Sequence, residues 1–164
     1  MLKGRVAVVT GASRGAGRGI ALALGEAGAT VYVTGRSSRG HATENLPGSI
    51  DETAEAVTAR GGRGIPVRCD HTVDEEVQAL FGQVRHENGH LDLLVNNAWG
   101  GYAGMYDGSG WGDGTQFDAP FWQQSLSRWD GMFTAGVRAH LVATYSRRCE
   151  MACRRSRRRR ASCP

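Results

Sequence analysis

The sequence predicts an α/β fold in three layers, with a parallel sheet between two layers of helices. Short apolar runs that suit buried strands, the first at 6–9, alternate with longer segments whose apolar residues recur at helical spacing. Glycine or Asn-Gly signals separate the segments, as expected for βαβ units. The 164 residues, 40% of them hydrophobic, are enough for one domain with a real core.

The first unit of the chain has the order strand, glycine loop, helix. The strand at 6–9 is followed by Gly11, Gly15 and Gly17, and the alanine- and leucine-rich segment 20–24 favours a helix. Glycines allow a tight turn and a close backbone approach to a pyrophosphate, and the free N–H groups at a helix N-terminus attract that anion. A dinucleotide is therefore the expected ligand.

The next elements continue the alternation. The first helix is expected to end near Ala27, with Gly28 as a left-handed cap, and a strand follows at 30–34. A polar loop at 37–48 is longer than most connections of this kind. The second helix opens with a capping box of Ser49 and Glu52, ends at Gly61-Gly62, and precedes a strand at 65–69.

Two more helices complete the predicted pattern. Thr72, with Glu75 and Glu76, is expected to cap a third helix that ends at Asn88-Gly89, and a fourth strand follows at 91–95. Its expected apolar stripe is Val73, Val77, Leu80, Phe81 and Val84. The last helix is expected to open at Ser127 and to run to about Tyr145. Its expected packing face is Trp129, Met132, Phe133, Val137 and Leu141.

The motif Gly-x-x-x-Gly-x-Gly after Thr10, together with Asn96-Asn97-Ala98, resembles the short-chain dehydrogenase/reductase family. The resemblance implies a Rossmann-like three-layer sandwich with strand order 3-2-1-4 over residues 1–145, from which the C-terminal strands are missing. It also implies a nicotinamide cofactor and a small carbonyl or alcohol substrate in an intact relative. The cofactor-binding residues that it implies are Gly11, Ser13, Arg14, Gly15, Gly17, Ile20, Arg36, Asp70, Asn97 and Ala98.

Charge near the second strand predicts which cofactor is bound. Binders of NAD usually place an acidic side chain there for the ribose 2′-OH, and this chain has none. Arg36 and Arg14 suit a 2′-phosphate instead, because guanidinium groups form charge-assisted hydrogen bonds to phosphate. We therefore expect NADP rather than NAD. The resemblance further implies that Asp70 contacts the adenine ring.

Several departures from the family pattern put catalysis in doubt. Trp99 stands where the family usually has glycine, which indicates either a wider loop or an aromatic wall beside the nicotinamide. Gly136 stands where the family has an asparagine. The family's serine and Tyr-x-x-x-Lys pair are not found, since Tyr145 is followed four residues later by Cys149 and the only lysine is Lys3. No catalytic residue is therefore assigned, and the ending resembles a truncation or an out-of-frame end.

Two segments do not read as regular elements. Seven of the fifteen residues at 100–114 are glycine, with aromatic residues between them, which fits a substrate lid or a surface insertion equally. Residues 146–164 form an arginine-rich tail that is expected to be disordered. Residues 147–164 hold eight of the 20 Lys and Arg residues and one of the 16 Asp and Glu residues, so the body is mildly acidic. A specific nucleic-acid-binding domain is not predicted.

Three functions remain open on the sequence alone. The chain is an NADP-dependent oxidoreductase with unrecognised catalytic groups, a non-catalytic dinucleotide-binding fragment, or a body whose arginine tail binds polyanions. Cys69 is expected to be an inert core thiol, and Cys149 and Cys153 are not assigned to a metal. With no apolar span and no room for a signal peptide, a cytoplasmic location is expected. Ordinary dimerisation is doubtful, and aggregation through an open sheet edge is expected.

Overall fold

The computed structural model describes residues 1–43, 46–101 and 118–147. Four parallel strands form one sheet in the order β3-β2-β1-β4, which confirms the predicted order. The strands are β1 (Val6–Val9), β2 (Thr30–Gly35), β3 (Arg63–Arg68) and β4 (Leu93–Val95). The helices are α1 (Gly15–Glu26), α2 (Ile50–Ala59), α3 (Asp74–Asn88) and α4 (Leu126–Phe133), with a short 3₁₀ helix η1 (Phe121–Gln123) before α4.

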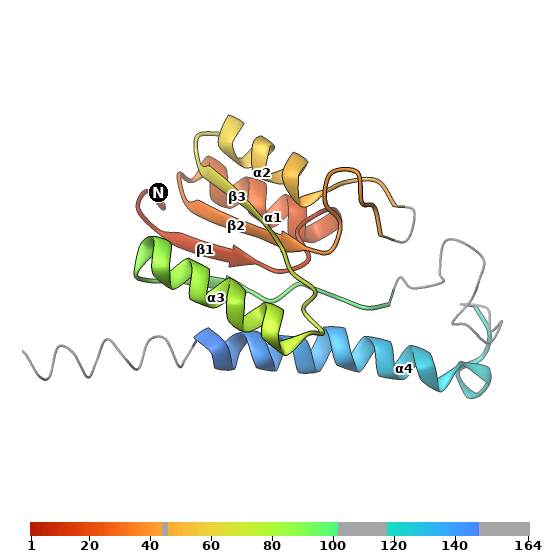
Figure 1. Ribbon diagram of the computed structural model, residues 1–164. Coiled ribbons are helices and arrows are strands. Elements are labelled where there is room, and N and C mark those ends of the chain that lie inside the picture. The colour runs from red at the N-terminus through yellow and green to blue at the C-terminus, as the bar shows by residue number, and fades with distance from the viewer. Residues whose placement is uncertain (44–45, 102–117, 148–164) are drawn as a thin grey trace, which may run out of the picture.

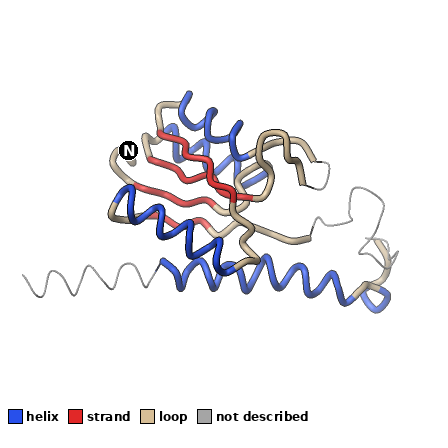
Figure 2. The backbone as a smooth tube through the Cα atoms, viewed as in Figure 1, coloured by secondary structure: helices blue, strands red, loops and turns tan. Residues whose placement is uncertain are grey.

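The helix that begins with α4 is long. It continues through a π-helical segment, η2 (Thr134–Arg138), and remains helical over 139–147. Figure 1 shows α1 and α2 on one face of the sheet, and α3 with the long helix on the other. The tube in Figure 2 shows the sheet between these two layers of helices. The three-layer α/β sandwich is therefore present.

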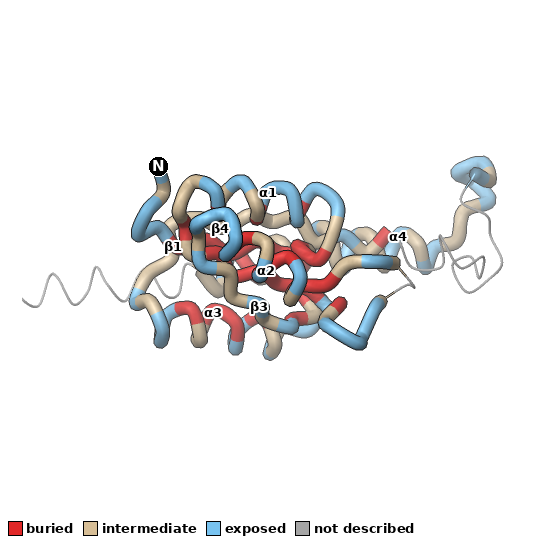
Figure 3. The backbone as a smooth tube through the Cα atoms, turned by 90° about the horizontal axis from the view of Figure 1, so that it is seen from above, coloured by how far each residue is buried: buried red, intermediate tan, exposed pale blue. Residues whose placement is uncertain are grey.

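The alternation of side chains along the strands divides the core between the two faces of the sheet. Val8 and Tyr32 pack with Leu80 and Phe81 of α3, whereas their strand neighbours Val9, Val31 and Val33 pack toward α1 and α2. Side chains alternate across a strand with a period of two, so strands covered on both faces are apolar throughout. Figure 3 shows the buried stretches gathered at the centre of the molecule.

The ends of the first two helices follow the predictions. Gly28 has φ of +89°, as a left-handed residue after a helix requires. The Ser49 side chain accepts a hydrogen bond from the Glu52 N–H at 3.1 Å, and the Glu52 carboxylate accepts one from the Ser49 N–H at 3.2 Å. The predicted capping box is therefore present.

Two strands begin at a different residue than predicted, and β2 extends one residue further, to Gly35. The third strand begins at Arg63 rather than residue 65, because β2 offers pairing partners as far back as Thr30. It ends at Arg68, and Cys69 follows it fully buried. The fourth strand begins at Leu93 rather than residue 91, because the Asp92 carboxylate itself accepts the Val6 N–H at 2.8 Å in place of a ladder carbonyl.

The beginning of the third helix also differs. Its N-cap is Val73, without a side-chain hydrogen bond, and Val73 is 37% exposed instead of lying in the apolar stripe. The Thr72 hydroxyl donates to Asp70 Oδ1 at 2.7 Å and so does not cap the helix. The rest of the stripe is buried, and Gly89 ends the helix at φ of +68°, as predicted.

The expected packing face of the last helix is wrong. The helix begins at Leu126 with Ser125 as N-cap, and the small residues Ala139 and Ala143 are the ones that are buried. Four of the five expected residues are exposed and only Met132 is half-buried, because small side chains let the opposite face of this helix approach the core closely. We call these exposed residues the α4 outer stripe: Leu126, Trp129, Phe133, Val137, Leu141 and Tyr145, which are 43% to 81% exposed.

Two predicted segments lie largely outside the described residues. They are the glycine and aromatic segment 100–114, of which 102–114 is not described, and the tail 146–164, of which 148–164 is not described. The lid and tail hypotheses therefore stay predictions. No helix in the described part of the chain is long and apolar enough to cross a membrane.

Candidate cofactor site

The glycine loop after β1 is packed so tightly that two of its glycines cannot be replaced without movement. A Cβ on Gly11, which has φ of +65°, would lie 2.8 Å from Ala98 Cα. A Cβ on Gly17 would lie 2.4 Å from both Asn97 Nδ2 and the Gly11 carbonyl oxygen. Gly15 has φ of +54° and no neighbour within 4 Å, so only its backbone conformation requires glycine.

Hydrogen bonds join this loop to the chain that leaves β4. The Thr10 hydroxyl accepts the N–H groups of Asn97 at 2.8 Å and Ala98 at 2.9 Å, and donates to the Val95 carbonyl at 3.3 Å. Asn97 Nδ2 donates to the carbonyls of Thr10 at 2.9 Å and Gly11 at 3.0 Å. Asn97 therefore supports the loop, and the two segments form one unit.

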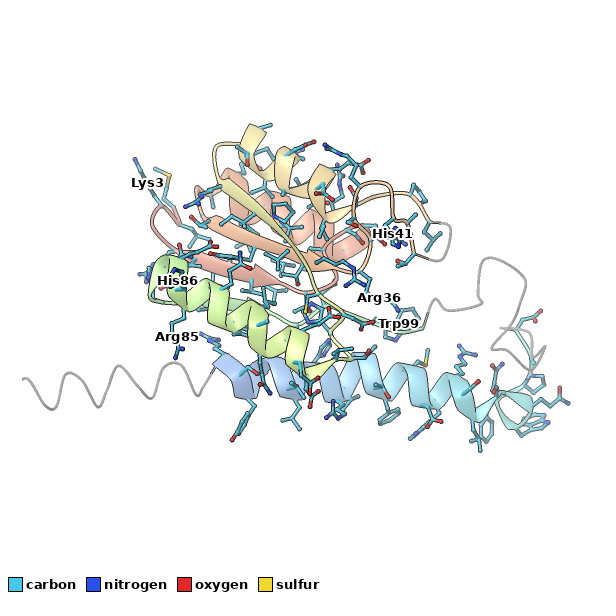
Figure 4. The ribbon with its side chains drawn as sticks, in the orientation of Figure 1. Lys3, Arg36, His41, Arg85, His86 and Trp99 are labelled. Carbon is cyan, nitrogen blue, oxygen red and sulfur yellow. The ribbon has the colours of Figure 1, made fainter. Side chains whose placement is uncertain are left out.

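A cavity of about 540 Å³ opens at the carboxyl ends of the strands. This is a typical volume for a small-molecule site, and the carboxyl edge of a parallel sheet is where such folds bind ligands. Nine of the ten predicted residues line it: Gly11, Ser13, Arg14, Gly15, Gly17, Arg36, Asp70, Asn97 and Ala98. Ile20 is not among the lining residues and is 37% exposed on α1. Figure 4 shows Arg36 and Trp99 at this end of the sheet and Lys3 at the other.

The N-terminus of α1 fits an anionic ligand. No side chain caps it and its first turn holds no acidic residue, whereas α2 has a full capping box. Arg14, Gly15, Ala16 and Gly17, which begin this helix, all line the cavity. Arg14 Nε is buried and has no hydrogen-bond partner among the described residues. Unsatisfied donors at a helix N-terminus are a suitable site for phosphate.

Asp70 lies beside the cavity in its ionised form. Burial opposes ionisation, but hydrogen bonds from the Thr72 hydroxyl and N–H, and the positive charge of Arg36, outweigh it and lower the pKa of the Asp70 carboxyl. The N–H bond to Asp70 Oδ1 is 2.9 Å long. Asp70 is therefore a fixed acceptor at the end of β3.

His71 and Cys69 also line the cavity, and neither is charged at neutral pH. His71 is 5% exposed, and its Nε2 lies 2.8 Å from the Thr34 hydroxyl. Burial lowers the pKa of His71 to about 4 and raises the pKa of the Cys69 thiol to about 12. The prediction of an inert core thiol agrees with this environment. The polar residue His71 was missed, because only the fold brings it to the cavity.

The other end of the cavity is formed by the long helix and the segment after β4. Trp99, which is 41% exposed, lines it together with Asp130, Gly131 and Thr134. The sequence did not indicate the three helix residues, because they lie far along the chain from the glycine loop. Tyr145 is not among the lining residues and is 68% exposed. The described residues contain no cluster of His, Cys, Asp or Glu suited to a metal.

Known proteins share this sequence pattern. The family model described as short chain dehydrogenase matches residues 5–157. The protein named Dehydrogenase/reductase SDR family member 1 of Mus musculus is 42% identical over 144 residues, which is 87% of this chain and 41% of the mouse protein. The chain thus spans about two fifths of the length of this relative.

Solved structures share the fold. A short chain dehydrogenase from Mycobacterium thermoresistibile matches with a TM-score of 0.74 and 25% identity, over 92% of this chain and 48% of that one. A metagenomic short-chain oxidoreductase in complex with NADP matches with a TM-score of 0.69 and 27% identity, over 92% of this chain and 57% of that one. The chain belongs to the short-chain dehydrogenase/reductase family.

Proposed function

We propose that the chain is the NADP-binding portion of an oxidoreductase that acts on small carbonyl or alcohol compounds. The observation that carries this proposal is the pair of arginines, Arg14 and Arg36, that line the cavity where β2 ends. The sequence has no acidic residue at 36–43, directly after that strand, that could hold a ribose 2′-OH. The solved relative in complex with NADP supports the same cofactor.

Each part of the site has a proposed role toward the cofactor. The N–H groups at the start of α1 bind the pyrophosphate, and the two arginines bind the 2′-phosphate. Asp70 accepts a hydrogen bond from the adenine amino group. Trp99 forms a wall beside the nicotinamide ring. When bound, the nicotinamide supplies or accepts a hydride.

A binding titration tests the cofactor. Each charge-assisted contact contributes about 1.5–3 kcal/mol, so we expect NADPH to bind about one to two orders of magnitude more tightly than NADH. Arg36→Ala should remove most of that preference. Arg60→Ala is the matched control, because Arg60 is an exposed C-cap at the far end of α2. Equal dissociation constants of the unaltered protein for the two cofactors would contradict the proposal.

We further propose that the chain as given binds cofactor without reducing a carbonyl at a meaningful rate. The family's Tyr-x-x-x-Lys pair is not found in the sequence, and a general acid is worth about two to four orders of magnitude in rate. NADPH oxidation should stay at background with aldehydes, ketones and quinones. Turnover that disappears in Tyr145→Phe would refute this. A cytoplasmic location stays part of the proposal.

A further inference from the structure

Arg14 is held by the loop that connects β2 to α2. Its Nη2 donates to Ser37 Oγ at 2.6 Å and to the Gly48 carbonyl at 3.4 Å, and its Nη1 donates to the Thr43 carbonyl at 3.3 Å. We call these four residues, Arg14, Ser37, Thr43 and Gly48, the Arg14 clamp. The clamp fixes a long side chain that would otherwise sample many rotamers.

The close approach of the Gly48 backbone to Ser13 and Arg14 is independent evidence for the clamp. Gly48 has φ of +99°, and a Cβ there would lie 2.6 Å from the Ser13 carbonyl oxygen and 3.4 Å from Arg14 Cβ. The returning arm of the loop therefore rests directly on the glycine loop. Any larger residue would push the two apart.

The hydrogen bonds at Ser37 leave one donor unused. Ser37 Oγ accepts from Arg14 Nη2 and from the Thr43 N–H at 3.2 Å, which occupies both of its lone pairs. Its own proton must then point to Thr43 Oγ1, which is 2.5 Å away. The hydroxyl proton of Thr43 takes no part in this arrangement, and Thr43 lines the cavity.

We propose that Ser37 and Thr43 determine the preference for the 2′-phosphorylated cofactor, an inference that rests on the proposed function. Thr43 donates its hydroxyl proton to the 2′-phosphate. Ser37, only 1% exposed, is a positioning residue that holds the Arg14 guanidinium toward the same group. Arg14 lines the same cavity, and its Nε is buried without a hydrogen-bond partner among the described residues, so the loop does not satisfy every donor of this guanidinium.

Dissociation constants for NADPH and NADH, measured on the full chain, test this. Thr43→Val and Ser37→Ala should each weaken the binding of NADPH by at least about fivefold and leave the binding of NADH unchanged. The reason is that a hydrogen bond to a charged group is worth about tenfold or more in affinity. Thr43→Ser keeps the hydroxyl and should keep the preference. The variants should change the binding of 2′-phosphoadenosine as they change that of NADPH, and should leave the binding of adenosine 5′-phosphate unchanged.

A glycine pair tests the clamp without touching a hydrogen-bonding side chain. Gly48→Ala should lower the NADPH preference. Gly40→Ala should not, although Gly40 also has positive φ, at +78°, because it has no neighbour within 4 Å.

Three results would overturn the inference. One is a full NADPH preference in both Ser37→Ala and Thr43→Val. Another is an equal loss of affinity for both cofactors in these variants, because a merely structural role would produce that result. The third is an unaltered protein without preference, which would refute the proposed cofactor as well and is thereby distinguished from the other two.

Discussion

Replacing Thr10 with valine removes one hydroxyl that joins the glycine loop to the end of β4. Thr10 is 1% exposed and its hydroxyl makes three hydrogen bonds, two of them as acceptor from the N–H groups of Asn97 and Ala98. Valine has nearly the same shape, so the variant deletes the bonds without opening a cavity. The Val95 carbonyl keeps a partner, because the Thr10 N–H also donates to it at 3.0 Å.

The expected loss follows from the two N–H groups that are left without an acceptor. A fully buried unsatisfied group costs about 1–3 kcal/mol. Both groups are only partly buried beside the cavity, where solvent can replace part of the bond, so we take the lower end for each. Thr10→Val should therefore lower the free energy of unfolding by about 2 kcal/mol, which is about 4–8 °C in Tm for a domain of this size.

Urea unfolding followed by far-UV circular dichroism measures this difference. Thr10→Ser is the matched control, because it keeps the hydroxyl and loses only a methyl group. The valine variant should also weaken NADPH binding, because the freed segment at Asn97 supports the glycine loop. The reasoning is refuted if Thr10→Val is as stable as the unaltered protein to within about 0.5 kcal/mol, or if serine loses as much as valine.

Three further predictions concern the site and the surface. Gly17→Ala should abolish cofactor binding, because its Cβ would lie 2.4 Å from Asn97 Nδ2, while Gly19→Ala, with no neighbour within 4 Å, should bind normally in the same titration. The unfolded state protonates His71 near pH 6.5 and the folded state only near 4, so stability should fall by roughly 3 kcal/mol between these values as pH decreases. Urea unfolding at both pH values should show a smaller fall in His71→Gln, and an unchanged fall would exclude His71 as the cause. The α4 outer stripe and the open edge of β4 should cause self-association at tens of micromolar, and a monodisperse monomer in light scattering would contradict this.

The sequence by itself determined the order and type of the strands and main helices, and it picked out the glycine loop and several other residues of the candidate site. Local signals suffice for both. Buried strands must be apolar on both faces, the Ser49 capping box marks a helix start, and the glycine loop needs glycine where side chains would collide. The strand pattern and the capping box act on near neighbours in the chain, and the glycine spacing is itself a local signal, although the atoms that exclude a Cβ at Gly11 and Gly17 include Asn97 and Ala98. Nine of the ten predicted residues accordingly line one cavity.

Only the tertiary structure decided which residues from distant segments complete the site and which face of the last helix is buried. Both faces of that helix carry apolar residues, and close packing selected Ala139 and Ala143 over the larger Trp129 and Phe133. His71 reaches the cavity from the segment after β3, and Thr134 reaches it from the middle of the long helix. The hydrogen bonds of Arg14 to a loop more than twenty residues away had no sequence signal, because the partners of a long side chain depend on how the backbone brings them together.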